Sequence, residues 1–105
     1  MAVKILPAAR NRILEIWDYT KKKWDEQQAD KYVCELIGAI NDLPKRRSQW
    51  KPVGDFQGLY FFRFSYHYIF FRKLSTRTLG VISILHENMD IPSRLKEDVG
   101  QGEDK

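Results

Sequence analysis

The chain has 105 residues, of which 43% are hydrophobic and 13% aromatic, enough for one packed core. No stretch approaches the 18 apolar residues of a membrane span, and the opening Met1–Pro7 turns polar too early for a secretory signal. The formal charge is +4, but the last ten residues hold two basic and four acidic ones, so residues 1–95 carry +6. This excess fits an anionic partner, nucleic acid or an acidic protein segment, and equally a surface that is merely basic.

The first third of the chain predicts a short strand and then a helix. Val3–Leu6 is apolar and is closed by Pro7, as in an edge strand. After it, apolar residues recur at helical spacing and are expected on one face of a helix: Ile13, Ile16, Trp17 and Trp24.

A second helix follows almost at once. Asp25 with Gln28 three residues later resembles a capping box, and Pro44 ends the helix. Between them the apolar residues keep three-four spacing: Ala29, Tyr32, Val33, Leu36, Ile37, Ile40 and Leu43. Two helices joined this closely form a helical hairpin. Cys34, the single cysteine, excludes an internal disulfide, suits a reducing cytoplasm and is expected to be a small buried residue.

Beyond a basic connector the pattern changes to that of strands. Leu59–Phe64, Tyr66–Lys73 and Leu79–Leu85 are short and rich in aromatic or β-branched residues. Strands this close in sequence must be antiparallel. The sequence therefore predicts an α+β domain over residues 1–95, in the order β-α-α-β-β-β, with the helical hairpin on one face of the sheet. Residues 96–105 are expected to be a disordered tail.

Three segments resemble the ParE/RelE toxin superfamily of bacterial type II toxin–antitoxin systems. The stretch ARNRILEIWDYTKKKWDEQQADKYVCEL, residues 9–36, is similar to that family's opening helical hairpin. HYIFFR, residues 67–72, is similar to its H-x-I-F-Y-R strand, and ISILHENMD, residues 82–90, to its I-x-I-L-H-x-x-M-D ending. The resemblance spans nearly all of residues 3–95 in the same order.

The two branches of this superfamily imply different chemistry. RelE-type toxins cut mRNA on the ribosome, which requires groups that neutralise phosphate and move protons. Here Arg63, Arg72 and His86 are the catalytic candidates under that alternative. However, no tyrosine follows His86, and two carboxylates, Glu87 and Asp90, would repel an RNA backbone. The ending resembles the ParE branch, which poisons DNA gyrase without being an enzyme.

The resemblance to the ParE branch implies two partners, DNA gyrase and a ParD-like antitoxin with an acidic, disordered C-terminal segment. It implies no cofactor, metal, membrane or small-molecule substrate. His86 has only His67 as a second imidazole, so a metal site is not expected. The candidates for contact with the target are Arg63, Arg72, His86, Asp90 and Arg94. The candidates for contact with the antitoxin are aromatic residues expected to be left exposed on the sheet, together with one on the hairpin: Trp17, Tyr60, Phe62, Phe64, Tyr66 and Tyr68.

Two clusters of basic residues complete the pattern. Arg63, Arg72, Lys73 and Arg77 are expected either to gather into one basic surface or to act as solvated strand-edge charges that discourage edge pairing. The connector carries a denser cluster around Trp50, consisting of Lys45, Arg46, Arg47 and Lys51. It is either a nucleic-acid contact or a solvated loop.

Overall fold

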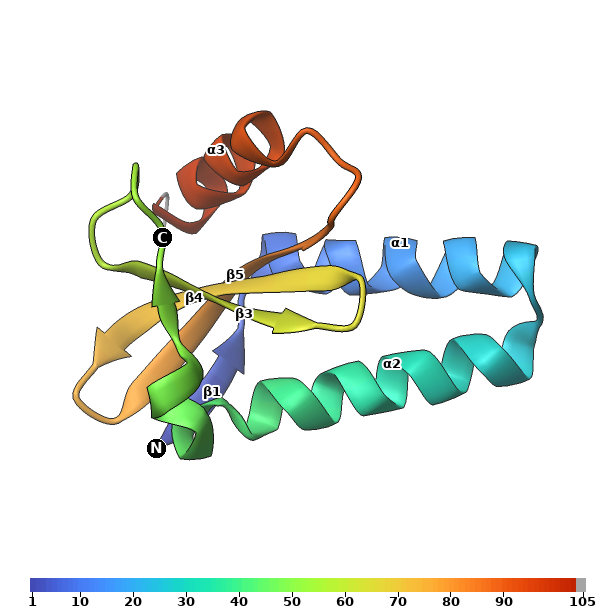
Figure 1. The fold of residues 1–105 in the computed structure, drawn as a ribbon, viewed down its shortest axis with the longest axis horizontal. Helices are drawn as coiled ribbons and strands as arrows, with labels where there is room; N and C mark the ends of the chain where they lie inside the picture. Colours follow the sequence, from blue (N-terminus) through green and yellow to red (C-terminus); the bar gives the residue numbers. More distant parts are fainter. Residues whose placement is uncertain (104–105) are drawn as a thin grey trace.

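A computed structural model describes residues 1–103 and contains one five-stranded sheet with helices on both faces (Figure 1). The elements in chain order are β1 (Ala2–Ile5), α1 (Pro7–Lys23), α2 (Glu26–Asn41), the 3-10 helix η1 (Leu43–Gln49), β2 (Lys51–Pro52), β3 (Leu59–Phe64), β4 (His67–Ser75), β5 (Thr78–His86) and α3 (Ile91–Glu103). The predicted α+β class, N-terminal strand and helical hairpin are confirmed. The chain also has β2, η1 and α3, which were not predicted.

The strands lie in the order β1-β5-β4-β3-β2. β1 pairs in parallel with β5, from Ala2 opposite Thr78 to Ile5 opposite Val81. A parallel pair needs a long crossover, which the hairpin of α1 and α2 supplies. The other neighbours are antiparallel, as predicted. Thus β1 is an edge strand and β4, with its apolar run, is central.

The helical hairpin covers one face of the sheet. Pro7 occupies the first turn of α1, where its missing N–H costs nothing, and the Asp25 side chain accepts the backbone N–H of Gln28 at 2.7 Å to begin α2. Apolar side chains of both helices meet the sheet in one core cluster that includes Ala9, Ile13, Ile16, Leu36, Ile40, Ile69, Phe71 and Val81.

Two expectations about the hairpin are wrong. Trp24 follows the last residue of α1 instead of continuing its apolar face, and its side chain is 70% exposed. Cys34 is exposed as well. It lies two residues, about 200° of helical turn, from buried Leu36, so it faces away from the core.

The second face of the sheet is covered in part by α3 (Figure 1). Leu95 and Val99 pack with Phe70 and Ile82 in a separate apolar cluster. The expectation of a disordered tail is therefore wrong for residues 96–103, which are helical, while residues 104 and 105 lie outside the described part. The composition of this segment did not predict a helix, because its acidic residues suggest a solvated tail. Asp98 is instead buried and bonded to residues far away in the sequence.

Candidate functional site

The end of the sheet at the β3–β4 turn holds two histidines that face each other. His67 begins β4 and His86 ends β5, and the two are direct partners across the ladder. Their rings meet edge to face with centroids 5.1 Å apart. A two-residue turn, Ser65–Tyr66, joins β3 to β4 and brings exposed Tyr66 over His86, with ring centroids 6.4 Å apart.

His67 is the buried member of this pair, with 9% of its surface exposed. Its Nδ1 lies 2.7 Å from the hydroxyl of Tyr32 on α2. Burial, followed by the neighbouring His86, lowers the pKa of His67 to about 4. Burial also raises the pKa of Tyr32, which keeps its hydroxyl protonated. At neutral pH the Tyr32 hydroxyl therefore donates to the neutral His67 ring, and this hydrogen bond ties α2 to β4.

His86 is the half-exposed member, and its orientation is fixed by the backbone. Its Nδ1 accepts the N–H of Asn88 at 3.0 Å. This bond leaves Nε2 as the nitrogen that carries the proton of a neutral ring. His86 is thus positioned both to end β5 and to present Nε2 to a partner. Asp90 does not hold the His86 ring; it accepts the Ser93 hydroxyl at 3.0 Å.

Arg63 lies at the same end of the sheet, and its charge is already paired. Its Nη2 donates to Glu87 at 2.6 Å, its Nη1 to the Tyr68 hydroxyl at 3.2 Å and its Nε to the Ser65 carbonyl at 3.0 Å. Half of the Arg63 side chain remains exposed. The carboxylate of Glu87 therefore offsets the positive charge with which Arg63 would otherwise bind a phosphate.

The other target candidates do not join this cluster as one site. Arg72 lies opposite Leu59 and Gly80, five residues along β4 from His67, which is about 17 Å at the usual strand rise. Asp90 directly precedes α3 and Arg94 lies in its first turn, where the Arg94 N–H donates to the Asp90 carbonyl at 3.1 Å. Of the two alternatives for Arg63, Arg72, Lys73 and Arg77, a single basic surface is excluded, because Arg63 lies at the opposite end of the strands from the other three.

The antitoxin candidates divide between the two faces of the sheet. Tyr60, Phe62 and Phe64 are partly buried on the hairpin side, whereas Tyr68 lies on the α3 side and Tyr66 is 61% exposed in the turn. Trp17 is half-buried between the helices, where its Nε1 donates to Asp30 at 2.8 Å. The expected single exposed aromatic face does not exist, because α3 covers much of one face and the hairpin covers the other.

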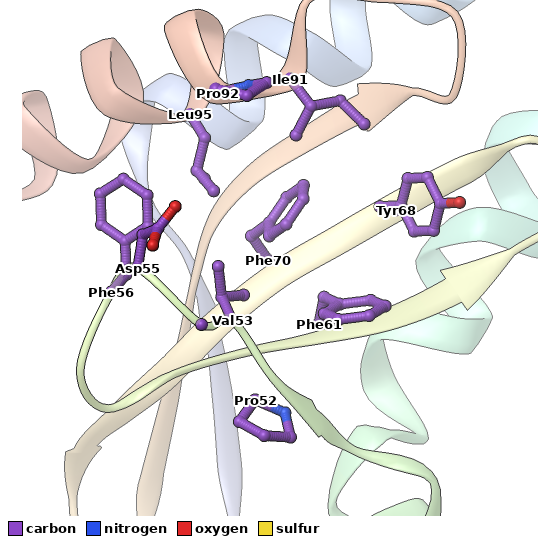
Figure 2. A pocket seen from close by; sticks show the side chains of 11 residues that line it. Pro52, Val53, Asp55, Phe56, Phe61, Tyr68, Phe70, Ile91, Pro92 and Leu95 are labelled. Carbon is purple, nitrogen blue, oxygen red and sulfur yellow. The ribbon is translucent and has the colours of Figure 1, made fainter.

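An open apolar pocket of about 360 Å³ lies between α3, β3 and the loop after β2 (Figure 2). Figure 2 shows Phe70 pointing from the sheet toward Ile91 and Leu95 of α3, with Phe61 and Tyr68 beside it on the sheet. Beside it, β3 has an open edge. β2 pairs only with Tyr60 and Phe61, so within residues 1–103 no strand covers Phe62–Phe64 on that side.

The structure thus shows a histidine and arginine cluster, an apolar pocket and an open strand edge. The sequence had identified Arg63 and His86, but not Tyr32, His67 or Glu87, whose roles depend on contacts between distant segments. Within residues 1–103 no three His, Cys, Asp or Glu side chains gather as a metal site requires. No helix in the described part of the chain is long and apolar enough to cross a membrane.

The sequence is similar to proteins of one known family. Residues 3–91 match the family described as "ParE toxin of type II toxin-antitoxin system, parDE". The chain is 30% identical over 90 residues to toxin ParE1 of Mycobacterium tuberculosis, covering 85% of this chain and 92% of that protein. It is 30% identical over 80 residues to toxin ParE of Escherichia coli, covering 75% and 78%.

Two solved structures have similar folds. The chromosomal ParDE toxin–antitoxin system from P. aeruginosa aligns with a TM-score of 0.71 at 17% identity, over 82% of this chain and 95% of that one. The RelBE2 toxin–antitoxin complex from Mycobacterium tuberculosis aligns with a TM-score of 0.57 at 16% identity, over 81% and 88%. At these identities the likeness shows the fold alone.

Proposed function

This chain belongs to the ParE family of type II toxin–antitoxin toxins, and on that premise we propose that it arrests growth by inhibiting DNA gyrase. The inhibited gyrase would remain on cleaved DNA and block replication. On a plasmid such a toxin would serve plasmid maintenance. The proposal makes the toxin a binding protein and not an enzyme.

The observation that supports gyrase over mRNA is the ion pair between Arg63 and Glu87 at 2.6 Å. Metal-free RNA cleavage needs cations that are free to stabilise the phosphate as its charge develops. Arg63 is neutralised by Glu87, and Arg72 is about 17 Å from the histidines along β4. Of the three catalytic candidates, His86 alone is therefore available for RNA cleavage. The half-exposed cluster of Arg63, His86 and Glu87 suits contact with a protein instead.

We further propose that a ParD-like antitoxin binds along the open edge of β3. An extended segment can add a strand there, hydrogen bonding to the backbone of Phe62–Phe64. Its apolar side chains would cover the partly buried rings of Phe62 and Phe64 on one face and reach Tyr68 and the pocket on the other. An acidic segment would also be attracted by the basic body of the toxin.

The antitoxin site is tested by binding of the antitoxin's C-terminal segment to purified variants. Phe62→Ala is expected to weaken binding at least tenfold, since a buried aromatic anchor contributes more than about 1.4 kcal/mol. Leu14→Ala is the matched control, because Leu14 is 63% exposed on α1, away from β3. Equal affinities for Phe62→Ala and the unchanged toxin would exclude the β3 edge as the antitoxin site.

Gyrase is tested with toxin freed from its antitoxin, measuring both supercoiling and cleaved plasmid. Accumulation of cleaved plasmid that disappears when antitoxin is added is the expected result. No effect at micromolar, folded toxin would overturn the proposal. Cleavage of ribosome-bound mRNA in the same preparation would instead establish the endoribonuclease alternative, with Arg63 and His86 as its first residues to mutate.

A further inference from the structure

We propose that the end of the sheet opposite the histidine pair binds the phosphate backbone of double-stranded DNA. This surface, called here the basic end, is made by the start of β1, by residues 42–51 and by residues 72–78. These three segments carry one acidic residue, Asp42, and eight basic ones: Lys4, Lys45, Arg46, Arg47, Lys51, Arg72, Lys73 and Arg77. The chain as a whole has a net charge of only +4, so its positive charge is concentrated here.

The fold brings the three segments together. Lys4 and Arg72 both lie opposite Gly80 of β5, on either side of it, and are therefore about 10 Å apart on one face. The backbone N–H of Ala2 donates to the Arg77 carbonyl at 2.7 Å, which joins the start of β1 to the β4–β5 turn. Figure 1 shows this turn, the N-terminus and η1 at the same end of the molecule.

The connector is held against this end by Trp50. Its ring packs on Phe71 of β4 with centroids 4.9 Å apart, and its Nε1 donates to the Leu43 carbonyl at 2.9 Å. The guanidinium of Arg47 lies over the same ring, 5.5 Å from its centroid. The cations of η1 are therefore carried by an ordered 3-10 helix, and all three are exposed to solvent.

The positive charges of the basic end are not neutralised by ion pairs within residues 1–103. The ion pairs found within residues 1–103 involve Arg12, Lys22 and Arg63, and none includes a residue of the basic end. Lys45, Arg46, Arg47, Lys51, Lys73 and Arg77 are all exposed. A patch of this kind creates a positive potential that attracts a polyanion.

The geometry favours a nucleic-acid backbone over an acidic peptide. The cations are spread over three segments, and none of them lines the pocket beside α3. A peptide partner gains most of its affinity from apolar anchors, which this chain offers at the β3 edge and in the pocket. A duplex backbone is bound by distributed charge alone, through release of its counterions. This inference is independent of the proposed gyrase target, because the toxin itself would bind the DNA.

The test is fluorescence anisotropy of a labelled 20-base-pair duplex titrated with antitoxin-free toxin between 50 and 200 mM NaCl. We expect binding that weakens steeply with salt. Arg46→Glu/Arg47→Glu should weaken binding at 50 mM at least tenfold and reduce the slope of log K against log salt by about 2. Lys73→Glu/Arg77→Glu, from another segment, should do the same.

The matched control is Lys31→Glu/Lys96→Glu, which changes the net charge equally at exposed positions on α2 and α3. It is expected to weaken binding less than threefold, with each variant's melting temperature checked against the unchanged toxin. Equal weakening in all three double variants would overturn the proposal, because binding would then follow net charge and not location. Absence of binding at 50 mM NaCl would overturn it too. So would displacement of the duplex by polyglutamate at equal charge concentration, which would assign the basic end to an acidic protein segment.

Discussion

Arg12 of α1 and Asp98 of α3 form a two-pronged ion pair that clamps the C-terminal helix to the body of the protein. The guanidinium donates through Nε at 2.9 Å and through Nη2 at 3.1 Å, and Asp98 also accepts the hydroxyl of Ser83 on β5 at 2.6 Å. The side chains of Arg12 and Asp98 are only 11% and 4% exposed. The hydrogen bond to Asp98 raises the pKa of Arg12.

Removing one partner of this clamp should destabilise the fold. Asp98→Ala leaves the Arg12 charge buried without its partner, and we expect the free energy of unfolding to fall by about 3 kcal/mol. Glu15→Ala is the control, since Glu15 pairs with the same arginine but is 60% exposed, and it should cost at most about 0.5 kcal/mol. Urea denaturation measures both. Similar values for the two variants would show that the clamp does not hold α3.

The clamp also shows what the sequence can and cannot predict. The hairpin and the strands follow from local patterns: helical spacing of apolar residues, the Asp25 cap and runs of β-branched and aromatic residues. The helix α3 has a weak local pattern with two glycines, and its stability depends on Arg12 and Ser83, 86 and 15 residues away. In the same way His86 was visible from its position after a strand, whereas Tyr32 and Glu87 matter only because the fold brings them to His67 and Arg63.

The stability of the protein should depend on pH through His67. Its pKa is about 4 when folded and near 6.5 when unfolded, so the unfolded chain binds the proton more tightly. The contribution of the neutral ring is therefore complete above pH 6.5 and is lost as the pH falls toward 4. Between pH 7 and pH 5 the unchanged protein should lose about 2 kcal/mol more than His67→Gln. Urea titrations at the two pH values measure this difference, and parallel losses in both proteins would contradict it.

Replacing Ser65 in the β3–β4 turn by glycine should stabilise the protein. Ser65 has φ of 55°, a left-handed conformation that costs a residue with a Cβ about 1 kcal/mol. We expect Ser65→Gly to raise the free energy of unfolding by up to about 1 kcal/mol. Thr76→Gly, in the β4–β5 turn, is the control and should destabilise, because Thr76 has no positive φ to relieve. Thermal melting distinguishes the two, and destabilisation by both would show that the Ser65 side chain contributes more than its strain costs.

His86→Gln should separate the two possible targets. Glutamine keeps an acceptor and a donor but cannot act as an acid–base group near neutral pH. A gyrase poison should lose less than about threefold in plasmid cleavage, because one contact residue changes. An endoribonuclease should lose roughly 100- to 10,000-fold in rate. Antitoxin binding by the variant confirms that it is folded, and a loss of plasmid cleavage beyond tenfold would make His86 an anchor of the gyrase interface.

Gly80 of β5 and Leu74 of β4 should be coupled through direct contact. A Cβ on Gly80 would lie 2.8 Å from the Cγ and Cδ1 of Leu74, whose side chain lies over the glycine where the strand register shifts between Lys73 and Ser75. Gly80→Ala alone should therefore destabilise by about 1 to 2 kcal/mol, because the overlap forces Leu74 to move. In a Leu74→Ala background the overlap is gone and alanine suits a strand better than glycine, so the same substitution should be neutral or stabilise by up to about 1 kcal/mol. A double-mutant cycle by urea denaturation measures this change of sign. An equal cost in both backgrounds would mean that the backbone at Gly80, and not Leu74, requires the glycine.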